Sequence, residues 1–229
     1  GDLVNGHWWE GHRCVEQMGA LYYSGWKRRL EGHDLKYYVA VGDHELGDDP
    51  WKDDKKMELV PHFERVFAEH MGMPQNGPDG QKGRAYYVLN KNVLMITVET
   101  FEIHDGRVVS TVSGDNLKWF RDTIDTHKDK VDFIIVQGHV PVFGEIKARS
   151  SSKIMLNEGR DNPFWKAMKE GGVDVYLCGE FHDVTILESD GIWQIVHGSS
   201  WGRKRVNTMD YLVMTSSPRS LKLEMKSFP

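Results

Sequence analysis

Short apolar runs, rich in β-branched and aromatic residues, recur along the chain and predict β-strands. Residues 133–136 (FIIV) are apolar throughout, which is typical of a strand buried on both faces. Polar residues between neighbouring runs predict hairpin turns at residues 89–93 and 189–191. The predicted strands cover residues 36–41, 84–90, 93–98, 131–137, 173–178, 184–188, 192–197, 211–215 and 221–225.

Apolar positions at helical spacing predict helices between several of these strands. The boundary residues agree, since Gly32 and Gly72 follow two of the helices and Pro61 would lie in the first turn of one. The predicted helices cover residues 10–31, 59–70, 115–128 and 162–170. Early alternation of strands and helices, followed by a late run of strands, favours an α/β fold with two packed sheets flanked by helices.

Composition narrows the class of protein. The 229 residues are 39% hydrophobic and 28% charged, which predicts one globular domain with a buried core. The net charge of −5 gives no electrostatic argument for a nucleic-acid partner. No apolar run approaches the ~18 residues that a transmembrane helix needs, and two cysteines, Cys14 and Cys178, do not make a disulfide framework.

Four glycine-led motifs fall where predicted strands should end or turn. These motifs contain Asp2, residues 43–45 (Asp-His-Glu), His139, and the pair Glu180 and His182. Three of the motifs directly follow apolar runs, and a glycine there lets the next side chain point into the crevice beyond the strand ends. We therefore expect these side chains to meet at one rim of the sheet.

Carboxylates and imidazoles gathered in this way are the ligands of divalent metals. Each motif alone is more often a turn or a capping residue, but four in this order favour a metal site. Two metals side by side would activate a water and clamp a phosphoryl group, and a histidine that is not a ligand could protonate the leaving oxygen.

The order Gly-Asp, Gly-Asp-His-Glu, Gly-His, Gly-Glu-x-His resembles the calcineurin-like metallophosphoesterases, which include purple acid phosphatases and Ser/Thr protein phosphatases. The resemblance spans essentially the whole chain. It implies a two-sheet β-sandwich flanked by helices and a binuclear metal centre. Carried over to this chain, it assigns metal ligation to Asp2, Asp43, His139, Glu180 and His182, general acid catalysis to His44, and supporting roles to Asn5 and Glu45.

This chain departs from the family pattern at its beginning. The opening Asp-x-His motif is absent, so the first metal would keep only Asp2, shared with the second metal, and His182. We therefore expect the domain formed by residues 1–229 to be incomplete at its N-terminus and to lack the first strand of the sheet.

Two ligand positions also depart from the family pattern. Asp43 stands in place of the usual Asn, and Glu180 stands in place of the usual His. Both changes supply anionic oxygen, which suits Mn²⁺ or Mg²⁺ at the second site better than zinc, although iron or zinc could occupy the centre.

Other positions have competing interpretations. Asn5 takes the place of an Asp that pairs with the catalytic histidine in some relatives, so we expect a lower pKa for His44 than in those relatives. His7 and Arg149 could contact a substrate, but a solvent-exposed histidine and a solvated basic loop are the preferred interpretations.

The predicted function is hydrolysis of a phosphate mono- or diester by a hydroxide activated at the binuclear centre, with His44 as acid. The partner would be a small phosphorylated substrate. The alternative is a weakly active or inactive module that uses the same fold for binding, since a fold alone does not prove an activity.

Overall fold

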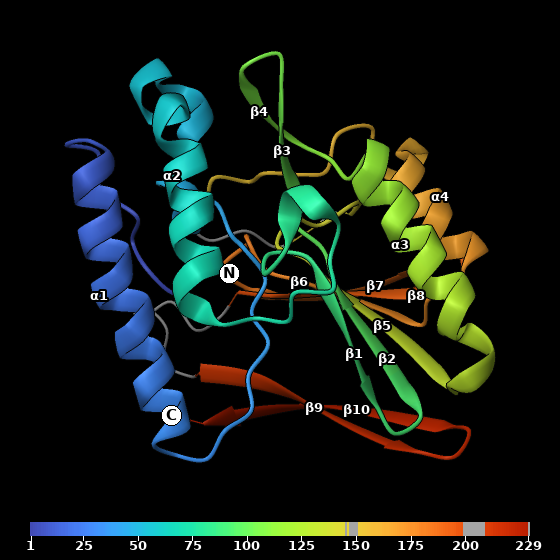
Figure 1. Ribbon diagram of the computed structural model, residues 1–229. Helices are drawn as coiled ribbons and strands as arrows, with labels where there is room; N and C mark the ends of the chain where they lie inside the picture. The colour runs from blue at the N-terminus through green and yellow to red at the C-terminus, as the bar shows by residue number, and fades with distance from the viewer. Residues whose placement is uncertain (145, 147–150, 199–208, 229) are drawn as a thin grey trace.

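A six-stranded mixed sheet forms the centre of the protein in the computed structural model, which describes residues 1–144, 146, 151–198 and 209–228 (Figure 1). Four neighbouring strands run parallel, and an antiparallel strand closes each edge. In spatial order the strands are β1 (Tyr86–Asn90), β2 (Val93–Thr97), β5 (Phe133–Gln137), β6 (Val175–Cys178), β8 (Ile192–His197) and β7 (Val184–Ser189).

Both hairpin turns predicted from the sequence are confirmed. Asn90 pairs with Val93 across the β1–β2 turn, and Ser189 pairs with Ile192 across the β7–β8 turn. In the second turn Asp190 and Gly191 have φ values of 57° and 81°. Two positive φ angles match the right-handed twist of the strands, which is why an Asp-Gly pair is favoured there.

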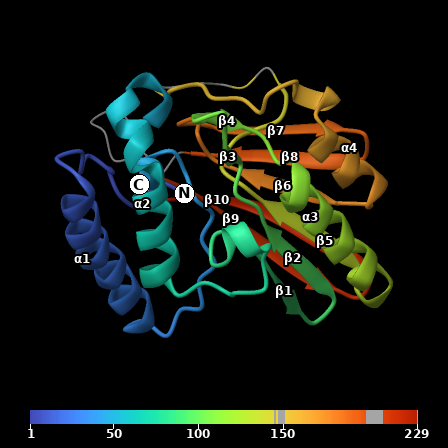
Figure 2. The ribbon, with the colours of Figure 1, turned by 45° about the horizontal axis from the view of Figure 1, so that its top comes forward.

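The two faces of the sheet are covered differently, as Figure 2 shows. A hairpin of β9 (Met209–Ser217) and β10 (Ser220–Phe228) packs on one face, where its leucines meet Ile135 and Val175. The next residues along the strands, Val136 and Tyr176, point to the other face, because side chains alternate along a strand. That face carries α3 (Gly114–His127) and α4 (Pro163–Glu170). The predicted α/β fold, with two packed sheets flanked by helices, is therefore confirmed.

A pair of helices lies beside the sheet (Figure 1). They are α1 (His12–Glu31) and α2 (Asp54–Met71). Gly19 is buried where they touch, and a Cβ added to it would lie 2.1 Å from Cγ1 of Val66. The absence of a side chain at this position therefore sets how closely the two helices approach.

Three features of the fold differ from the prediction. The first is a hairpin of β3 (Phe101–His104) and β4 (Arg107–Ser110), which the sequence analysis missed. Its strands are only four residues long, and Glu102, His104 and Arg107 interrupt the apolar pattern. Its turn, however, is the Asp105–Gly106 pair with φ values of 50° and 73°, a recognised hairpin signal.

The second difference concerns residues 36–41, which do not form a strand, so that prediction was wrong. Their backbone groups bond to side chains instead of a strand ladder. The carbonyl of Val39 accepts a hydrogen bond from the hydroxyl of Tyr86 at 2.9 Å, and that of Tyr38 accepts one from Gln137 Nε2 at 3.2 Å. A β-branched and aromatic composition reflects burial against neighbours as much as strand pairing.

The third difference is the start of α2, which lies at Asp54 rather than at residue 59. Asp53 caps the helix, because its side chain accepts hydrogen bonds from the amides of Lys55 and Lys56 at 2.9 and 3.3 Å. Pro61 therefore lies inside the helix and not in its first turn.

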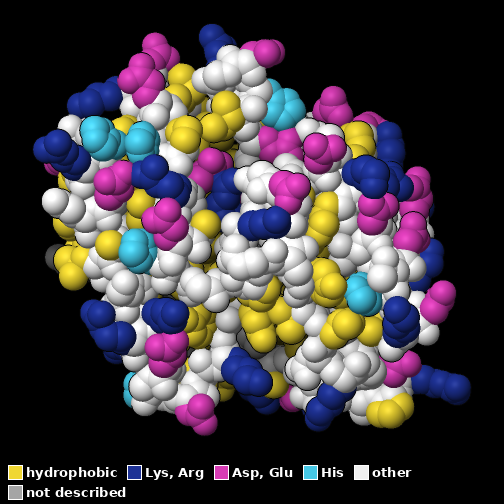
Figure 3. All heavy atoms as spheres, viewed as in Figure 1, with side chains coloured by type: hydrophobic (Ala, Val, Ile, Leu, Met, Phe, Trp, Pro, Cys, Tyr) yellow, Lys and Arg dark blue, Asp and Glu magenta, His cyan; other side chains and the backbone are white. Residues whose placement is uncertain are grey.

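The surface mixes both signs of charge. Figure 3 shows Lys and Arg interspersed with Asp and Glu over the face seen in Figure 1. Within the part of the chain that the structure describes, no helix combines the length and apolarity that crossing a membrane would require.

Candidate metal centre

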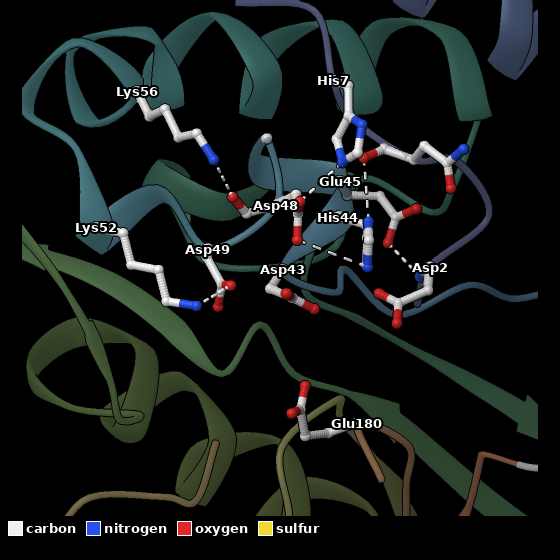
Figure 4. A network of polar contacts seen from close by, with 12 residues as sticks. Asp2, His7, Asp43, His44, Glu45, Asp48, Asp49, Lys52, Lys56 and Glu180 are labelled. Carbon is white, nitrogen blue, oxygen red and sulfur yellow. Dashed lines mark hydrogen bonds and ion pairs between the residues drawn. The ribbon is translucent and has the colours of Figure 1, made fainter. Parts of the chain in front are cut away.

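Four loops converge at one end of the sheet and carry most of the predicted site residues (Figure 4). His139 follows β5, and Glu180 follows β6. Asp2 comes from the first loop, and Asp43 directly precedes a 3-10 turn at His44–Leu46. The structure therefore brings these residues together although they lie far apart in the sequence.

His139 lies at the centre of the group and is buried. Its Nε2 atom is 3.2 Å from Oδ1 of Asp43, 3.5 Å from Oδ1 of Asp2 and 3.5 Å from Oε2 of Glu180. Asp43 and Glu180 are also buried, with 2% and 5% of their surface exposed. Three carboxylates around one nitrogen in a water-poor site create a strong demand for positive charge.

The pKa values show this demand. Burial lowers the pKa of His139, but the charge of Asp2 and hydrogen bonds to Asp43 and Glu180 outweigh it and raise the pKa to about 10. Burial conversely raises the pKa of Asp43, but the hydrogen bond and charge of His139 outweigh it, and the net shift is downward. In the metal-free protein a proton on His139 therefore supplies the charge that the carboxylates need.

Two of the carboxylates are held in unusual backbone geometry. Asp2 and Glu180 both have φ of 64°, in the left-handed region that side-chain-bearing residues rarely adopt. Such conformations cost about 1–3 kcal/mol and persist where the surroundings enforce them, often at functional sites. The amide of Ile154, which donates to Oε1 of Glu180 at 3.1 Å, is one such contact.

Glu45 fixes the first loop from beneath. This fully buried side chain accepts hydrogen bonds from the amides of Asp2 at 2.6 Å, Leu3 at 2.7 Å and Gly42 at 2.8 Å. Glycine is also needed at position 42 for the first loop to pack this closely, because an added Cβ would lie 2.2 Å from Oδ1 of Asp2. The supporting role expected for Glu45 thus has a geometric basis: it places the Asp2 carboxylate.

His44 lies beside the group rather than inside it. Its Nδ1 is 3.0 Å from the carbonyl oxygen of Asn5, and its Nε2 is 3.8 Å from Oδ1 of Asp48. Burial lowers the pKa of His44, but the charges of Asp2, Asp43 and Asp48 outweigh it and raise the pKa. The Asn5 contact is made by the main chain, and an Asp at that position would supply it equally.

The remaining predicted residues are placed as follows. His182 lines both cavities of the centre but belongs to none of the close ligand clusters found among the described residues. The side chain of His7 is 52% exposed, and its Nε2 is 2.7 Å from Oδ2 of Asp48. Arg149 lies outside the described residues.

Sequence reasoning missed Asp48, which contacts both His7 and His44. The only signal in the sequence is its position four residues after His44, at the point where a polar loop begins. It also missed Lys52, which forms an ion pair with Asp49 at the rim of the centre.

Two cavities open on the centre. One of about 420 Å³ is lined by Asp2, His139 and Glu180 together with the backbone around Tyr38. The other, of about 490 Å³, is lined mainly by polar side chains that include Asp43, His44 and Lys52. A small, charged molecule would fit the second cavity better than an apolar one.

The donor set fits divalent metal ions. Ligand atoms of Asp43, His139 and Glu180 all lie within 4.8 Å of one another, and so do those of Asp2, Asp43 and His44. Within the described part of the chain, Oδ1 of Asp2 and Nδ1 of His139 are buried without a hydrogen bond. Oδ1 of Asp2 also lies 3.5 Å from Nε2 of His139, which belongs to the other cluster. A buried oxygen without a hydrogen bond, next to both clusters, could take a metal ion as its partner.

Comparison with solved structures gives distant similarities. The chain is 12% identical to TT1561 of Thermus thermophilus, with 90% of this chain and 79% of that one covered and a TM-score of 0.45. It is 14% identical to a Staphylococcus aureus structure described as a putative 5′-nucleotidase (74% and 35% covered, TM-score 0.42), so it spans about a third of that protein. It is 12% identical to GAP50, the anchor in the inner membrane complex of Plasmodium (79% and 67% covered, TM-score 0.38).

The family assignment rests on the sequence. No curated protein matches the chain. The sequence model of the calcineurin-like phosphoesterases matches residues 1–184, which include every residue of the centre described above. This chain belongs to the calcineurin-like phosphoesterase family.

Proposed function

We propose that this chain is a metal-dependent hydrolase of phosphate mono- or diesters in which His44 is the general acid. Membership of the family supports phosphoester hydrolysis in general. The observation that carries the finer proposal is the group of three carboxylates around buried His139, two of them buried as well, with a separate histidine beside it.

The ligands divide unevenly between the two metals. Asp43, His139 and Glu180 would hold one ion, and Asp2 would bridge to the other, for which His182 is the remaining protein ligand at the cavity wall. Two carboxylates and one imidazole favour Mn²⁺ or Mg²⁺ over zinc at the site formed by Asp43, His139 and Glu180. When bound, the ions would supply positive charge to the phosphate and lower the pKa of an attacking water.

His44 is arranged to move a proton. The carbonyl of Asn5 holds its Nδ1, so its Nε2 is the nitrogen directed toward Asp48 and the polar cavity. A proton on Nε2 would pass to the leaving oxygen as its bond to phosphorus breaks. General acid catalysis of this kind contributes about 10²- to 10⁴-fold to a rate.

The test compares leaving groups in wild type and His44→Gln with Mn²⁺ present. A poor leaving group such as an alkoxide depends on the acid, whereas p-nitrophenolate leaves readily without one. We expect the variant to lose about 10²-fold or more on phenyl or alkyl phosphate and much less on p-nitrophenyl phosphate.

An exposed histidine serves as the matched control. His33 lies in the turn after α1, so His33→Gln should match wild type on every substrate. Equal rates for His44→Gln and wild type on the poor leaving group would refute the acid role. No metal-dependent hydrolysis of mono- or diesters by wild type would favour a binding module instead.

A further inference from the structure

A second set of ligand atoms gathers at the mouth of the polar cavity, outside the buried centre. His7, His44 and Asp48 each offer one ligand atom, and the three atoms lie within 4.8 Å of one another. Nε2 of His7 is 2.7 Å from Oδ2 of Asp48, and Nε2 of His44 is 3.8 Å from Oδ1 of the same carboxylate. Figure 4 shows both imidazoles next to Asp48, each joined to its carboxylate by a dashed line.

The hydrogen bond at Nδ1 orients the ring of His44 so that Nε2 can coordinate a metal. In the neutral ring, Nδ1–H donates to the carbonyl of Asn5 at 3.0 Å, which leaves the lone pair on Nε2. Metal-binding histidines commonly use this arrangement, because a carbonyl acceptor fixes both the tautomer and the ring orientation.

The other two residues are also held in place. The ring of His7 packs against Trp9 with centroids 4.8 Å apart, and Nε1 of Trp9 donates to the carbonyl of Gly47 at 2.7 Å. Lys56 Nζ donates to the carbonyl of Asp48 at 2.7 Å. The three ligands therefore come from anchored segments of chain.

We propose that His7, His44 and Asp48 form a third metal site, selective for Zn²⁺, whose occupation switches the enzyme off. Two imidazole nitrogens and one carboxylate oxygen make a three-ligand zinc set that leaves a fourth position open. Zinc bonds of about 2.0–2.2 Å place tetrahedral ligands roughly 3.4 Å apart. The two imidazoles approach different oxygens of Asp48, at 2.7 and 3.8 Å. One ligand atom from each of the three residues lies within 4.8 Å of the other two, which is close to the spacing that a zinc site needs.

Selectivity follows from the contrast with the buried centre. The buried group is dominated by carboxylate oxygen, which suits Mn²⁺ and Mg²⁺, whereas this site is dominated by imidazole, which suits zinc. Zinc also binds nitrogen ligands more tightly than manganese does. Added zinc should therefore reach this site, and comparison with a variant that lacks the site distinguishes this zinc from any that exchanges into the centre.

The inhibitory effect rests on the proposed function of His44. Zinc on Nε2 would occupy the lone pair that otherwise carries the transferable proton, so His44 could not act as an acid. Release of zinc would restore the unligated ring, which makes the effect reversible.

Metal retention tests the site without relying on activity. Mn²⁺-loaded protein is incubated with Zn²⁺, passed through a desalting column and analysed for both metals. We expect wild type to retain about one zinc per chain more than His7→Gln, with equal manganese in both proteins. Gln keeps a donor for Asp48 but lacks the imidazole lone pair, and His33→Gln should retain as much zinc as wild type.

Cobalt absorption and inhibition kinetics complete the test. Co²⁺ added to wild type should give the intense visible bands of a tetrahedral site, and these should be lost in His7→Gln. The zinc concentration for half inhibition, measured against each protein's own zinc-free rate, should rise at least about 10-fold in His7→Gln.

The outcomes separate the two proposals. Equal zinc retention and equal cobalt spectra in wild type and His7→Gln would overturn the third site. Retention of the extra zinc without loss of rate would overturn its inhibitory role. A zinc difference between the two proteins, together with no hydrolysis by either, would support the site and refute the proposed function.

Discussion

At the scale of single residues, the arrangement of the centre depends strongly on a side chain that lines neither cavity. Glu45 is a fully buried carboxylate that accepts three backbone hydrogen bonds, and two of them come from Asp2 and Leu3. Burial raises its pKa, while hydrogen bonds from the amides of Asp2 and Gly42 oppose the shift. The glutamate that ends the Asp-His-Glu motif therefore positions Asp2 through its backbone amide.

Glu45→Gln tests this role. The amide NH₂ of Gln would face backbone N–H groups where an acceptor is needed, so the protein should lose about 2–4 kcal/mol of unfolding free energy. Displacement of Asp2 should also weaken metal binding by about 10- to 100-fold, as expected for a residue that orients a ligand. Urea unfolding and metal titration measure the two effects.

A control for this change lies on the exposed side of α2. Glu58→Gln alters an exposed glutamate and should change the unfolding free energy by less than about 0.5 kcal/mol. Similar unfolding curves for Glu45→Gln and Glu58→Gln would show that the buried carboxylate does not hold the loop.

At the scale of elements, the α1–α2 contact offers a comparison within one helix. Gly19 and Gly25 both lie inside α1, but an added Cβ meets Val66 at 2.1 Å at Gly19 and nothing within 4 Å at Gly25. Gly19→Ala should therefore cost about 1–3 kcal/mol through overpacking. Gly25→Ala should gain about 0.5–1 kcal/mol, because alanine is the better helix former.

Thermal unfolding of the two variants measures this difference. Opposite signs for the two substitutions are expected, with Gly19→Ala below wild type and Gly25→Ala above it. Equal stabilisation by both would mean that the helices are farther apart than the structure places them.

The elements also show how far the sequence alone could lead. Helices and parallel strands were predicted because their apolar periodicity is long and their ends carry turn residues. Residues 36–41 have the composition of a strand but bond to Tyr86 and Gln137, and that tertiary contact is invisible in a local pattern. Hairpin β3–β4 is too short for periodicity, so its Asp105–Gly106 turn was the only available signal.

The site was foreseeable to a similar degree. Glycine-led motifs at strand ends located His139 and Glu180, because parallel strands finish at a common edge. Asp43 joins them although the segment before it forms no strand. Asp48 could not be anticipated, since its contact with His7 depends on how two loops meet. The distinction between the buried centre and the His7–His44–Asp48 cluster exists only in three dimensions.

At the scale of the whole molecule, we propose that residues 1–229 act as one domain. The main hydrophobic core contains residues from the first loop, all four helices and the parallel strands. The second core joins the β9–β10 hairpin to the same sheet. The candidate metal centre lies where the loops of this shared core converge, so its stability should be coupled to that of the whole fold.

That coupling predicts how pH and metal together set stability. The pKa of His139 is raised from 6.5 to about 10 in the metal-free fold, because nearby carboxylates outweigh burial. The folded protein therefore holds this proton more tightly than the unfolded chain does. Its contribution, up to about 5 kcal/mol, is fully present below about pH 6.5 and is lost as pH rises toward about 10.

A bound divalent metal replaces the proton as the source of positive charge, so the stabilisation by Mn²⁺ should grow as pH rises. Urea unfolding between about pH 6 and about pH 8.5, with Mn²⁺ or with a chelator, measures the difference. Glu99, whose pKa burial raises to about 8, also changes stability over part of this range. Because Glu99 is present with and without metal, its effect cancels in the difference. If the gain in unfolding free energy on adding Mn²⁺ stayed constant with pH, metal and proton would not compete at His139. The assignment of His139 as a ligand would then be wrong.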